Sequence, residues 1–254
     1  MPTRDRTRMS PPTASAAALP YVGTWSMNPE KSDLTGTTMT FERLSTDEWQ
    51  SSRDGMTYRF RIDGKDHATG MGDTAAWDLI GDRTWQTTWK SNERRILSVE
   101  TLTLATDGTM LTISNRGTTP NGEPIDDATT FRRLAGASGL EGRWVSTNVR
   151  PGSPLIIEFI PAGEDRLTFR QPAWAVTCEA RLDGQDHPCV TPLGSGWTMA
   201  MSKASALELV MVVKKDARPV LNMTFTVLND GNTLTQVSET IGTNEKTRIV
   251  YDRR

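Results

Sequence analysis

Histidine and cysteine are scarce in this chain, and their scarcity argues against whole classes of site. Two histidines and two cysteines occur among 254 residues. Structural zinc sites and most transition-metal sites need several of these side chains close together. His67 and His187 lie in different halves of the chain, with no cluster of cysteine or histidine around either. We therefore predict no metal site.

Long apolar runs and an excess of positive charge are also missing. No stretch approaches the roughly 18 apolar residues that a membrane-spanning helix requires. The formal net charge is −2, and 24% of the residues are charged. A chain without a broad positive field has little attraction for phosphate backbones. This composition is typical of a soluble protein and argues against a membrane span and against nucleic acid as a partner.

Sequence motifs of known catalytic chemistry are absent as well. The chain has no Gly-x-Gly-x-x-Gly after a strand pattern, no Walker loop, no His-Glu-x-x-His and no Gly-x-Ser-x-Gly. We predict no cofactor, and the sequence leaves the oligomeric state open.

The first twenty residues, MPTRDRTRMSPPTASAAALP, are rich in small residues and proline and have no apolar period. A secretory signal needs an apolar region where this chain has Ser10, Pro11, Pro12 and Thr13. Residues 1–20 are therefore interpreted as a disordered tail and the protein as cytoplasmic. An exported protein with a trimmed signal is the alternative.

An internal repeat is the strongest positive signal. RIDGKDH (61–67) returns as RLDGQDH (181–187), GTW at 23 as GRW at 142, and LATDGTMLT as VLNDGNTLT, always in the same order. Trp77 is matched with Trp197, and Phe131 with Tyr251. Repeats in constant order indicate a duplicated fold unit. We place the copies at 21–134 and 140–254, joined by the linker 135–139.

The sequence of each copy predicts β-strands throughout. Segments such as MTFERL and TWQTTWK alternate or carry β-branched and aromatic residues, and Asp-Gly or Asn-Gly pairs punctuate them. Tight turns without crossover helices make consecutive strands antiparallel neighbours, and a large twisted sheet tends to close on itself. The predicted fold is all-β, with two tandem antiparallel up-and-down barrels of about 8–10 strands each.

The Gly-x-Trp of each copy and the arginine pair that ends it resemble the lipocalin and fatty-acid-binding calycin pattern. The residues are Gly23, Trp25, Arg132 and Arg133 in the first copy and Gly142, Trp144, Arg253 and Arg254 in the second. GTWSMNPEKSDL also resembles the opening of a group of small bacterial lipocalin-like proteins. This resemblance implies a barrel whose tryptophan is capped by an arginine at the closed end, with structural roles for the glycines and tryptophans. The second copy lacks the MNPEKSDL portion, which places any role of Asn28, Lys31 and Ser32 in the first barrel.

The Asp-Gly pairs at 63–64 and 183–184 predict two-residue hairpin turns. That register sets Phe60 opposite His67 and directs His67 into the first barrel, because opposite residues share a sheet face. It also sets Cys178 opposite Cys189. The alternatives are a solvent-facing histidine, and for the cysteines a disulfide; without an export signal we favour two thiols.

Glu100 aligns with Met223 of the second copy, so one predicted barrel carries a carboxylate where the other carries a thioether. Inside a barrel, burial would raise the pKa of this carboxyl unless a cation pairs with it. A wet position at the barrel mouth is the equally weighted alternative. Glu100 and His67 are thus the candidate catalytic residues.

The aromatic and methionine side chains on inward faces are the candidate ligand contacts. They are Tyr58, Phe60, Trp77, Trp85, Trp89, His187, Trp197, Met199, Met211, Met223 and Phe225. Barrels of this size either fill with side chains or hold one small ligand. We expect binding of a small, largely apolar molecule in a barrel or at the seam between barrels. The alternatives are a cofactor-independent isomerase or cyclase acting on such a molecule, as some two-domain lipocalin-like proteins are, and a solidly packed structural module.

Overall fold

The computed structural model describes residues 19–53, 56–119, 121–136, 138–153, 155–243 and 245–254. Most of the predicted tail, residues 1–18, and Ala137 of the predicted linker lie outside them. The last two residues of the predicted tail belong to the fold. Leu19 is buried in a hydrophobic core, and the Pro20 carbonyl accepts a hydrogen bond from Arg253. Leu19 and Pro20 therefore belong to the second barrel rather than to the predicted tail.

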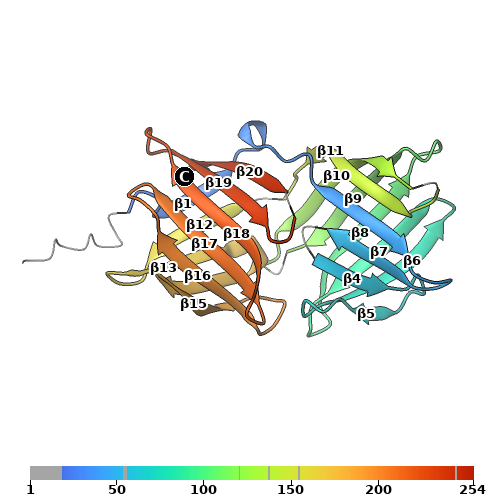
Figure 1. Ribbon diagram of the computed structural model, residues 1–254, viewed down its shortest axis with the longest axis horizontal. Coiled ribbons are helices and arrows are strands. Elements are labelled where there is room, and N and C mark those ends of the chain that lie inside the picture. The colour runs from blue at the N-terminus through green and yellow to red at the C-terminus, as the bar shows by residue number, and fades with distance from the viewer. Residues whose placement is uncertain (1–18, 54–55, 120, 137, 154, 244) are drawn as a thin grey trace, which may run out of the picture.

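Two antiparallel β-barrels lie side by side, which confirms the predicted fold class (Figure 1). The first barrel is a ten-stranded sheet in the order β4-β3-β2-β11-β10-β9-β8-β7-β6-β5, whose edges β4 and β5 are not paired with each other. Its strands are β2 (Thr38–Arg43), β3 (Trp49–Arg53), β4 (Met56–Phe60), β5 (Asp66–Ala68), β6 (Thr74–Gly81), β7 (Thr84–Lys90), β8 (Ile96–Leu104), β9 (Met110–Thr118), β10 (Pro124–Ala135) and β11 (Gly142–Arg150).

The second barrel is closed, because β1 pairs with both β12 and β20. Its strands are β1 (Gly23–Met27), β12 (Ile156–Pro161), β13 (Arg166–Gln171), β14 (Val176–Arg181), β15 (Asp183–Val190), β16 (Trp197–Lys203), β17 (Glu208–Lys215), β18 (Arg218–Val227), β19 (Thr233–Thr240) and β20 (Lys246–Arg253). Two short 3₁₀ turns complete the fold, η2 (Pro29–Lys31) and η3 (Pro172–Trp174). No helix in the described part of the chain is long and apolar enough to cross a membrane.

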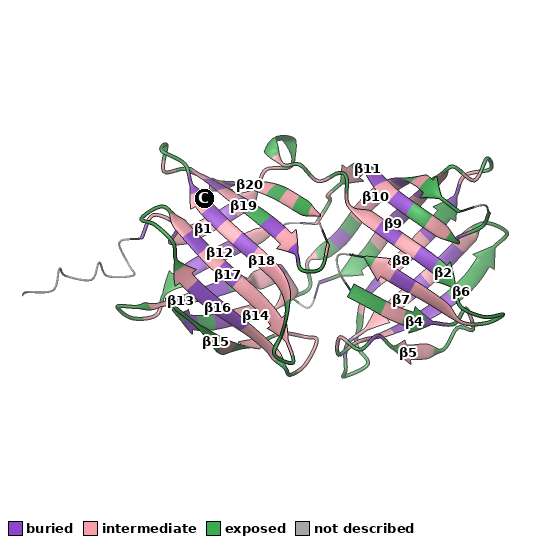
Figure 2. Ribbon diagram, viewed as in Figure 1, coloured by how far each residue is buried: buried purple, intermediate pink, exposed green. Residues whose placement is uncertain are grey.

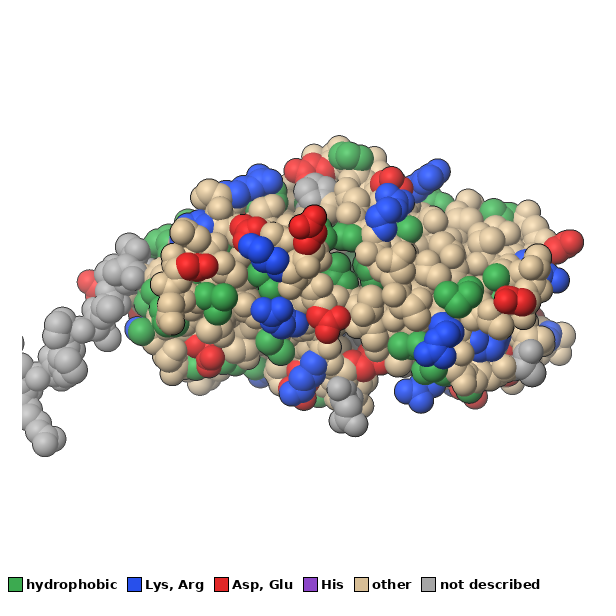
Figure 3. Space-filling model, turned by 90° about the horizontal axis from the view of Figure 1, so that it is seen from above, with side chains coloured by type: hydrophobic (Ala, Val, Ile, Leu, Met, Phe, Trp, Pro, Cys, Tyr) green, Lys and Arg blue, Asp and Glu red, His purple; other side chains and the backbone are tan. Residues whose placement is uncertain are grey.

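Burial alternates along the strands, as the sequence pattern predicts (Figure 2). On β17, Leu209 and Met211 are fully buried while the residues between and beyond them are partly exposed. Each barrel consequently has its own apolar core, while side chains of both charges are scattered over the outer face that Figure 3 shows.

The two barrels exchange their first strands. β1 opens the first sequence copy but pairs with β12 and β20 of the second, and β11 opens the second copy but lies between β2 and β10 of the first. The predicted copies at 21–134 and 140–254 are therefore not the two barrels. The predicted linker falls at the connection between the paired strands β10 and β11 of one barrel, and the chain passes from one barrel to the other between β1 and β2 and between β11 and β12 instead.

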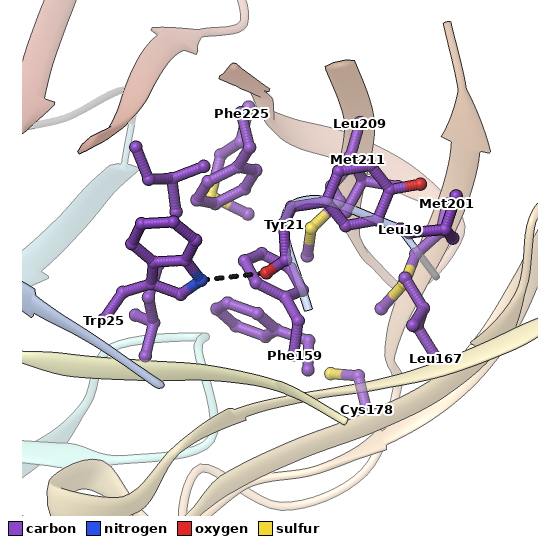
Figure 4. Packing of buried hydrophobic residues seen from close by; sticks show 14 of the residues in the cluster. Leu19, Tyr21, Trp25, Phe159, Leu167, Cys178, Met201, Leu209, Met211 and Phe225 are labelled. Carbon is purple, nitrogen blue, oxygen red and sulfur yellow. Dashed lines mark hydrogen bonds between the residues drawn. The ribbon is translucent and has the colours of Figure 1, made fainter. Parts of the chain in front are cut away.

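In each barrel an arginine of the last strand of one sequence copy covers a tryptophan. Arg253 Cζ lies 4.1 Å from the ring centroid of Trp25, and Arg133 Cζ lies 4.0 Å from that of Trp144. Both arginines also donate three hydrogen bonds to backbone carbonyls, those of Arg253 going to Pro20, Val22 and Gly231. Figure 4 shows the core beside Trp25, whose indole N–H donates to the Tyr21 carbonyl at 2.8 Å. Because of the exchange, each arginine covers the tryptophan of the other sequence copy.

The glycine of each Gly-x-Trp is required by its surroundings. Gly23 has φ 138° and Gly142 has φ 150°, in a region that side chains rarely adopt. A Cβ on either glycine would also lie within 3 Å of the capping guanidinium, at 2.7 Å for Gly23 and 2.8 Å for Gly142. The motif and the arginine cap therefore depend on each other.

The crossing that follows β1 is fastened to the second barrel. Asn28 Nδ2 and Lys31 Nζ donate to the Asp252 carboxylate at 2.6 and 2.9 Å, and the Ser32 hydroxyl accepts from the Val250 N–H. The expectation that these three residues serve the first barrel is wrong, because the exchange brings them to β20.

Neither Asp-Gly pair has the positive φ at both residues that the predicted two-residue turn requires, although β14 and β15 of the second copy still pair in the predicted register. Only the glycine of each pair has a positive φ, 69° at Gly64 and 74° at Gly184. The aspartates instead accept a hydrogen bond from the backbone N–H two residues further on, Asp63 from Lys65 and Asp183 from Gln185.

The predicted pairing of Phe60 with His67 is wrong, because β4 and β5 do not pair in the first barrel. β4 pairs only with β3, and β5 only with β6. Phe60 stacks on Trp77, with ring centroids 4.2 Å apart, and the next segment of chain reaches β6 through a parallel bridge between Ile62 and Trp77.

In the second copy the predicted pairing of Cys178 with Cys189 is confirmed, but the cysteines form a disulfide rather than two thiols. β14 and β15 correspond to β4 and β5 of the first copy. The disulfide therefore joins two strands whose counterparts in the first barrel are not paired with each other. Disulfides persist in oxidising compartments, whereas the N-terminal composition predicts a cytoplasmic protein, and the location stays a prediction.

Candidate functional site

The principal cavities lie where the two barrels meet, a region that we call the seam. One of them, called the large cavity below, has a volume of about 480 Å³ and is lined from the first barrel by Trp89 and Glu100 and from the second by Trp197 and Met223, among others. A cavity of about 230 Å³ enters the first barrel, and one of about 290 Å³ lies between the barrels beside β9 and β10. Glu100 lines all three cavities, so it marks the point where they adjoin.

Strand register explains how a carboxylate comes to this place. Trp77, Thr87, Glu100, Asn115 and Asp127 lie opposite one another across five consecutive strands, from β6 to β10. Directly opposite residues share one face of a sheet. Trp77 and Thr87 are buried, so this row lies on the inner face of the barrel. From Thr87 onward its members are polar.

The matching row of the second barrel has a different chemistry. It runs through Met201, Met211, Met223 and Ser238. Glu100 and Met223 hold equivalent places, as the repeat alignment predicts. The seam is therefore asymmetric, with polar groups on the first barrel and thioethers on the second.

Glu100 is paired with a cation. The Glu100 side chain is 16% exposed, and Oε1 lies 3.8 Å from Arg53 Nη1. Arg53 ends β3 opposite Met39, whose side chain is buried in the first barrel. The pair is thus held at the barrel mouth, where water reaches one side of it.

Tyr58 lies near this ion pair and is partly buried against the core of the first barrel. Burial raises the pKa of the Tyr58 hydroxyl, and the negative charge of Glu100 raises it further. The phenol therefore stays protonated at neutral pH and can donate a hydrogen bond. Its ring meets Trp89 edge to face, with centroids 5.4 Å apart.

Several polar atoms around the seam have no hydrogen-bond partner within the described residues. They are the Thr87 hydroxyl, Asn115 Oδ1 and the indole N–H groups of Trp89 and Trp197. A buried polar atom without a partner costs free energy of folding, roughly 1–3 kcal/mol for each group. Such atoms are retained at this cost where something else can satisfy them.

Polar atoms deeper in the second barrel are satisfied by one another. The Tyr251 hydroxyl donates to Gln236 Oε1 at 2.7 Å, and Gln236 Nε2 donates to the Ser238 hydroxyl at 2.8 Å. This network closes the inner part of the second barrel, while Gln236 also lines the large cavity.

A loop of the second barrel enters the mouth of the first. His187 pairs with Met199, whereas His67 pairs with Ala75, so the connection between β15 and β16 is the longer of the two. Its Leu193 lines both the large cavity and the first-barrel cavity. A Cβ on Gly72 would lie 1.7 Å from the Leu193 carbonyl oxygen, so only glycine allows this approach.

The longer loop also corrects the match of Trp77 with Trp197. Trp77 lies opposite Thr87 and Met201 lies opposite Met211, in the rows that contain Glu100 and Met223. Met201 is thus the structural counterpart of Trp77. Trp197 lies nearer the seam.

The predicted contact residues divide into three groups. Tyr58, Trp77, Trp89, Glu100, Trp197, Met199 and Met223 line the cavities. Phe60, Trp85, Met211 and Phe225 are buried in the two cores and are absent from the cavity walls described above.

The two histidines form the third group, because their side chains contact residues of the adjoining Asp-Gly turns. His67 Nε2 lies 2.9 Å from Asp63 Oδ1, and His187 Nε2 accepts from the Arg181 N–H at 3.3 Å. Neither lines the three cavities, so the structure does not bring His67 together with Glu100 at the cavity walls.

Sequence reasoning missed Arg53, Asn115, Leu193 and Trp174 of η3, all of which line seam cavities. Alternation on β3 could have placed Arg53 inside, since Ser51, two residues earlier, is buried. No comparable signal marks Leu193, whose position depends on the meeting of two barrels.

Among the described residues, no group of three histidine, cysteine, aspartate or glutamate side chains is arranged to hold a metal ion. Comparison of the chain with protein-family models, with curated proteins and with solved structures found no match.

Proposed function

We propose that this chain is a lipocalin-like protein that binds a small, largely apolar molecule at the seam between its two barrels. The observation that carries the proposal is the 480 Å³ cavity, whose walls combine tryptophan, methionine, leucine and the disulfide from both barrels. Ligand pockets are typically mostly apolar with a few polar groups and have volumes of about 300–1,000 Å³. The cavity and its polar edge at Glu100 match that description.

A fluorescent apolar probe tests this proposal. N-phenyl-1-naphthylamine should bind with enhanced emission and quench tryptophan fluorescence, because Trp89 and Trp197 line the cavity. Native mass spectrometry of the purified protein then identifies any small molecule that remains bound.

Matched variants locate the site. Val213 lines the cavity, and its neighbour Val212 points to the other face of β17. Val213→Phe should weaken probe binding about tenfold or more by filling the cavity, and Val212→Phe should leave it unchanged. Equal affinities for the two variants would contradict a site at the seam.

A cofactor-independent isomerase or cyclase is the second candidate. It is supported by Tyr58, which stays protonated beside the Glu100–Arg53 pair in an apolar surrounding. Such a pair of groups can donate and accept a proton on a bound substrate. Glu100→Gln should then abolish turnover while ligand binding persists, and unchanged turnover would rule out a catalytic role for Glu100.

A further inference from the structure

The loop that joins β15 to β16 lies where two cavities of the seam adjoin, the large cavity of about 480 Å³ and the smaller cavity of about 230 Å³ that enters the first barrel. We infer that Leu193 of this loop is the partition between them and sets the size of the ligand by confining it to the large cavity. This inference rests on the proposed function and names a residue that determines specificity at that same site.

The two cavities share part of their walls. The residues that line both are Asp73, Trp89, Glu100 and Leu193. A residue in both walls lies between the two spaces. Among the described residues, Leu193 is the one member of the second barrel that lines the smaller cavity. The second barrel thus contributes a single side chain to the shared wall.

The first-barrel members of the shared wall are held by contacts within their own barrel. The Trp89 ring packs edge to face on Tyr58, and the Asp73 carboxylate accepts a hydrogen bond from the Thr69 hydroxyl. Leu193 differs from Trp89 because the described residues of the two hydrophobic cores do not include it. Shortening the Leu193 side chain therefore changes the wall without removing a core residue.

The loop around Leu193 is held against both barrels. On the side of the second barrel, Lys215 Nζ donates a hydrogen bond to the Ser195 carbonyl at 2.8 Å. On the side of the first barrel, Gly194 comes so close that a Cβ on it would lie 3.0 Å from Asn92 Nδ2. These contacts keep the Leu193 side chain in its place between the cavities.

The partition has a consequence for ligand size. With Leu193 in place, a ligand occupies the large cavity alone. Without the branched end of this side chain, the smaller cavity joins it and adds nearly half as much volume again. Each methylene group that moves from water into an apolar cavity improves affinity about fourfold. Affinity should therefore rise with the chain length of a ligand until the available space is full. We call the chain length at which the rise stops the limiting length.

A homologous series of straight-chain alcohols tests the partition. The alcohols from hexan-1-ol to tetradecan-1-ol are titrated against bound N-phenyl-1-naphthylamine. In the wild type we expect the affinity to level off within the series. In Leu193→Ala the rise should continue over several more carbons and make tetradecan-1-ol bind about tenfold or more tightly than in the wild type. A wild-type affinity that rises to the end of the series contradicts a size limit at Leu193.

Leu97→Ala is the matched control. Of the two cavity walls, Leu97 belongs to that of the large cavity alone, and the described core residues do not include it. This variant deletes the same atoms as Leu193→Ala but opens no second space, so Leu193→Ala should extend the limiting length by more carbons. Octan-1-ol should bind both variants within about threefold of the wild type, which controls for folding.

Refilling the smaller cavity separates the two variants further. Met71 lines the smaller cavity and is absent from the described wall of the large one. Met71→Trp adds bulk there, so it should return the limiting length of Leu193→Ala toward that of the wild type and leave that of Leu97→Ala unchanged.

The outcomes distinguish the inference from the proposed function. If N-phenyl-1-naphthylamine does not bind the wild type, the proposed function fails and the inference falls with it. If the probe and the alcohols bind, but Leu193→Ala and Leu97→Ala have the same limiting length, the inference alone is contradicted. A limiting length of Leu193→Ala that Met71→Trp does not shorten contradicts it as well.

Discussion

Thr24 of β1 lies directly opposite Glu158 of β12, although the two residues belong to different copies of the repeat. In the other barrel, Arg143 of β11 lies opposite Thr40 of β2 in the same relation. If each copy kept its own first strand, Thr24 would face Thr40 instead. This pair of residues therefore distinguishes an exchanged fold from an unexchanged one.

Engineered cross-links test the exchange directly. Opposite residues in an antiparallel pair are close enough for a disulfide. Thr24→Cys combined with Glu158→Cys should form a cross-link that peptide mapping detects under non-reducing conditions. Thr24→Cys combined with Thr40→Cys should not. A cross-link in the second variant would show that each copy retains its own strand.

The arginine caps should contribute strongly to stability. Arg253→Met removes three hydrogen bonds to carbonyls and the contact with Trp25, so we expect a loss of roughly 3 kcal/mol in the free energy of unfolding. Arg133→Met should act similarly on the first barrel. Chemical denaturation measures both, with Arg132→Met, an exposed neighbour, as the control. A control loss as large as that of Arg133→Met would argue against a cap.

The disulfide should stabilise the second barrel. Cys178 and Cys189 are 11 residues apart, and closing a loop of that size typically contributes about 2–3 kcal/mol. Replacing both with serine should lower the free energy of unfolding by that amount and speed amide exchange in β14 and β15. Amides of β9 and β10, in the other barrel, are the internal reference. Titratable thiols in the unfolded, unreduced wild-type protein would contradict the bond.

Acid should weaken the link between the first crossing and β20. The hydrogen bond from the Lys31 ammonium, followed by that from the Asn28 amide, lowers the pKa of Asp252. A carboxyl whose folded pKa lies below its unfolded value of about 3.9 contributes stability that is complete above that value. This stability is lost as the pH falls through the folded pKa.

The melting temperature as a function of pH tests this assignment. Asp252→Asn should melt below the wild type near neutral pH, and the difference should shrink as the pH falls below about 4. Glu30→Gln, in the same η2 turn, is the control for a general change in charge. A difference between Asp252→Asn and the wild type that is constant with pH would contradict the assignment.

The sequence predicts the fold class because alternation and turn residues are local properties. It also matches Glu100 with Met223 correctly by the repeat alignment, but leaves open whether Glu100 lies inside the barrel or at its mouth. The exchange is invisible to the same reasoning for a physical reason. β1, which carries Trp25, and β11, which carries Trp144, pair with their neighbouring strands in the same register, so either strand fits either barrel.

The turns show a second limit. Asp63 and Gly64 fit a two-residue hairpin by composition, but the Asp63 carboxylate accepts a hydrogen bond from the Lys65 N–H, and the Phe60 ring stacks on Trp77 of β6. Side-chain contacts formed only in three dimensions decide between such alternatives. Leu193 and Arg53 belong to the candidate site by the same kind of contact.

Because of the strand exchange, neither sequence copy contains all the strands of one barrel. If either sequence copy were removed, the remaining barrel would lack the first strand that the other copy supplies. Heat or denaturant should consequently unfold both cores in one cooperative transition, and a destabilising substitution in one barrel should lower the stability of the other. The inner surfaces of two barrels that depend on each other in this way nevertheless differ, as Glu100 and Met223 show.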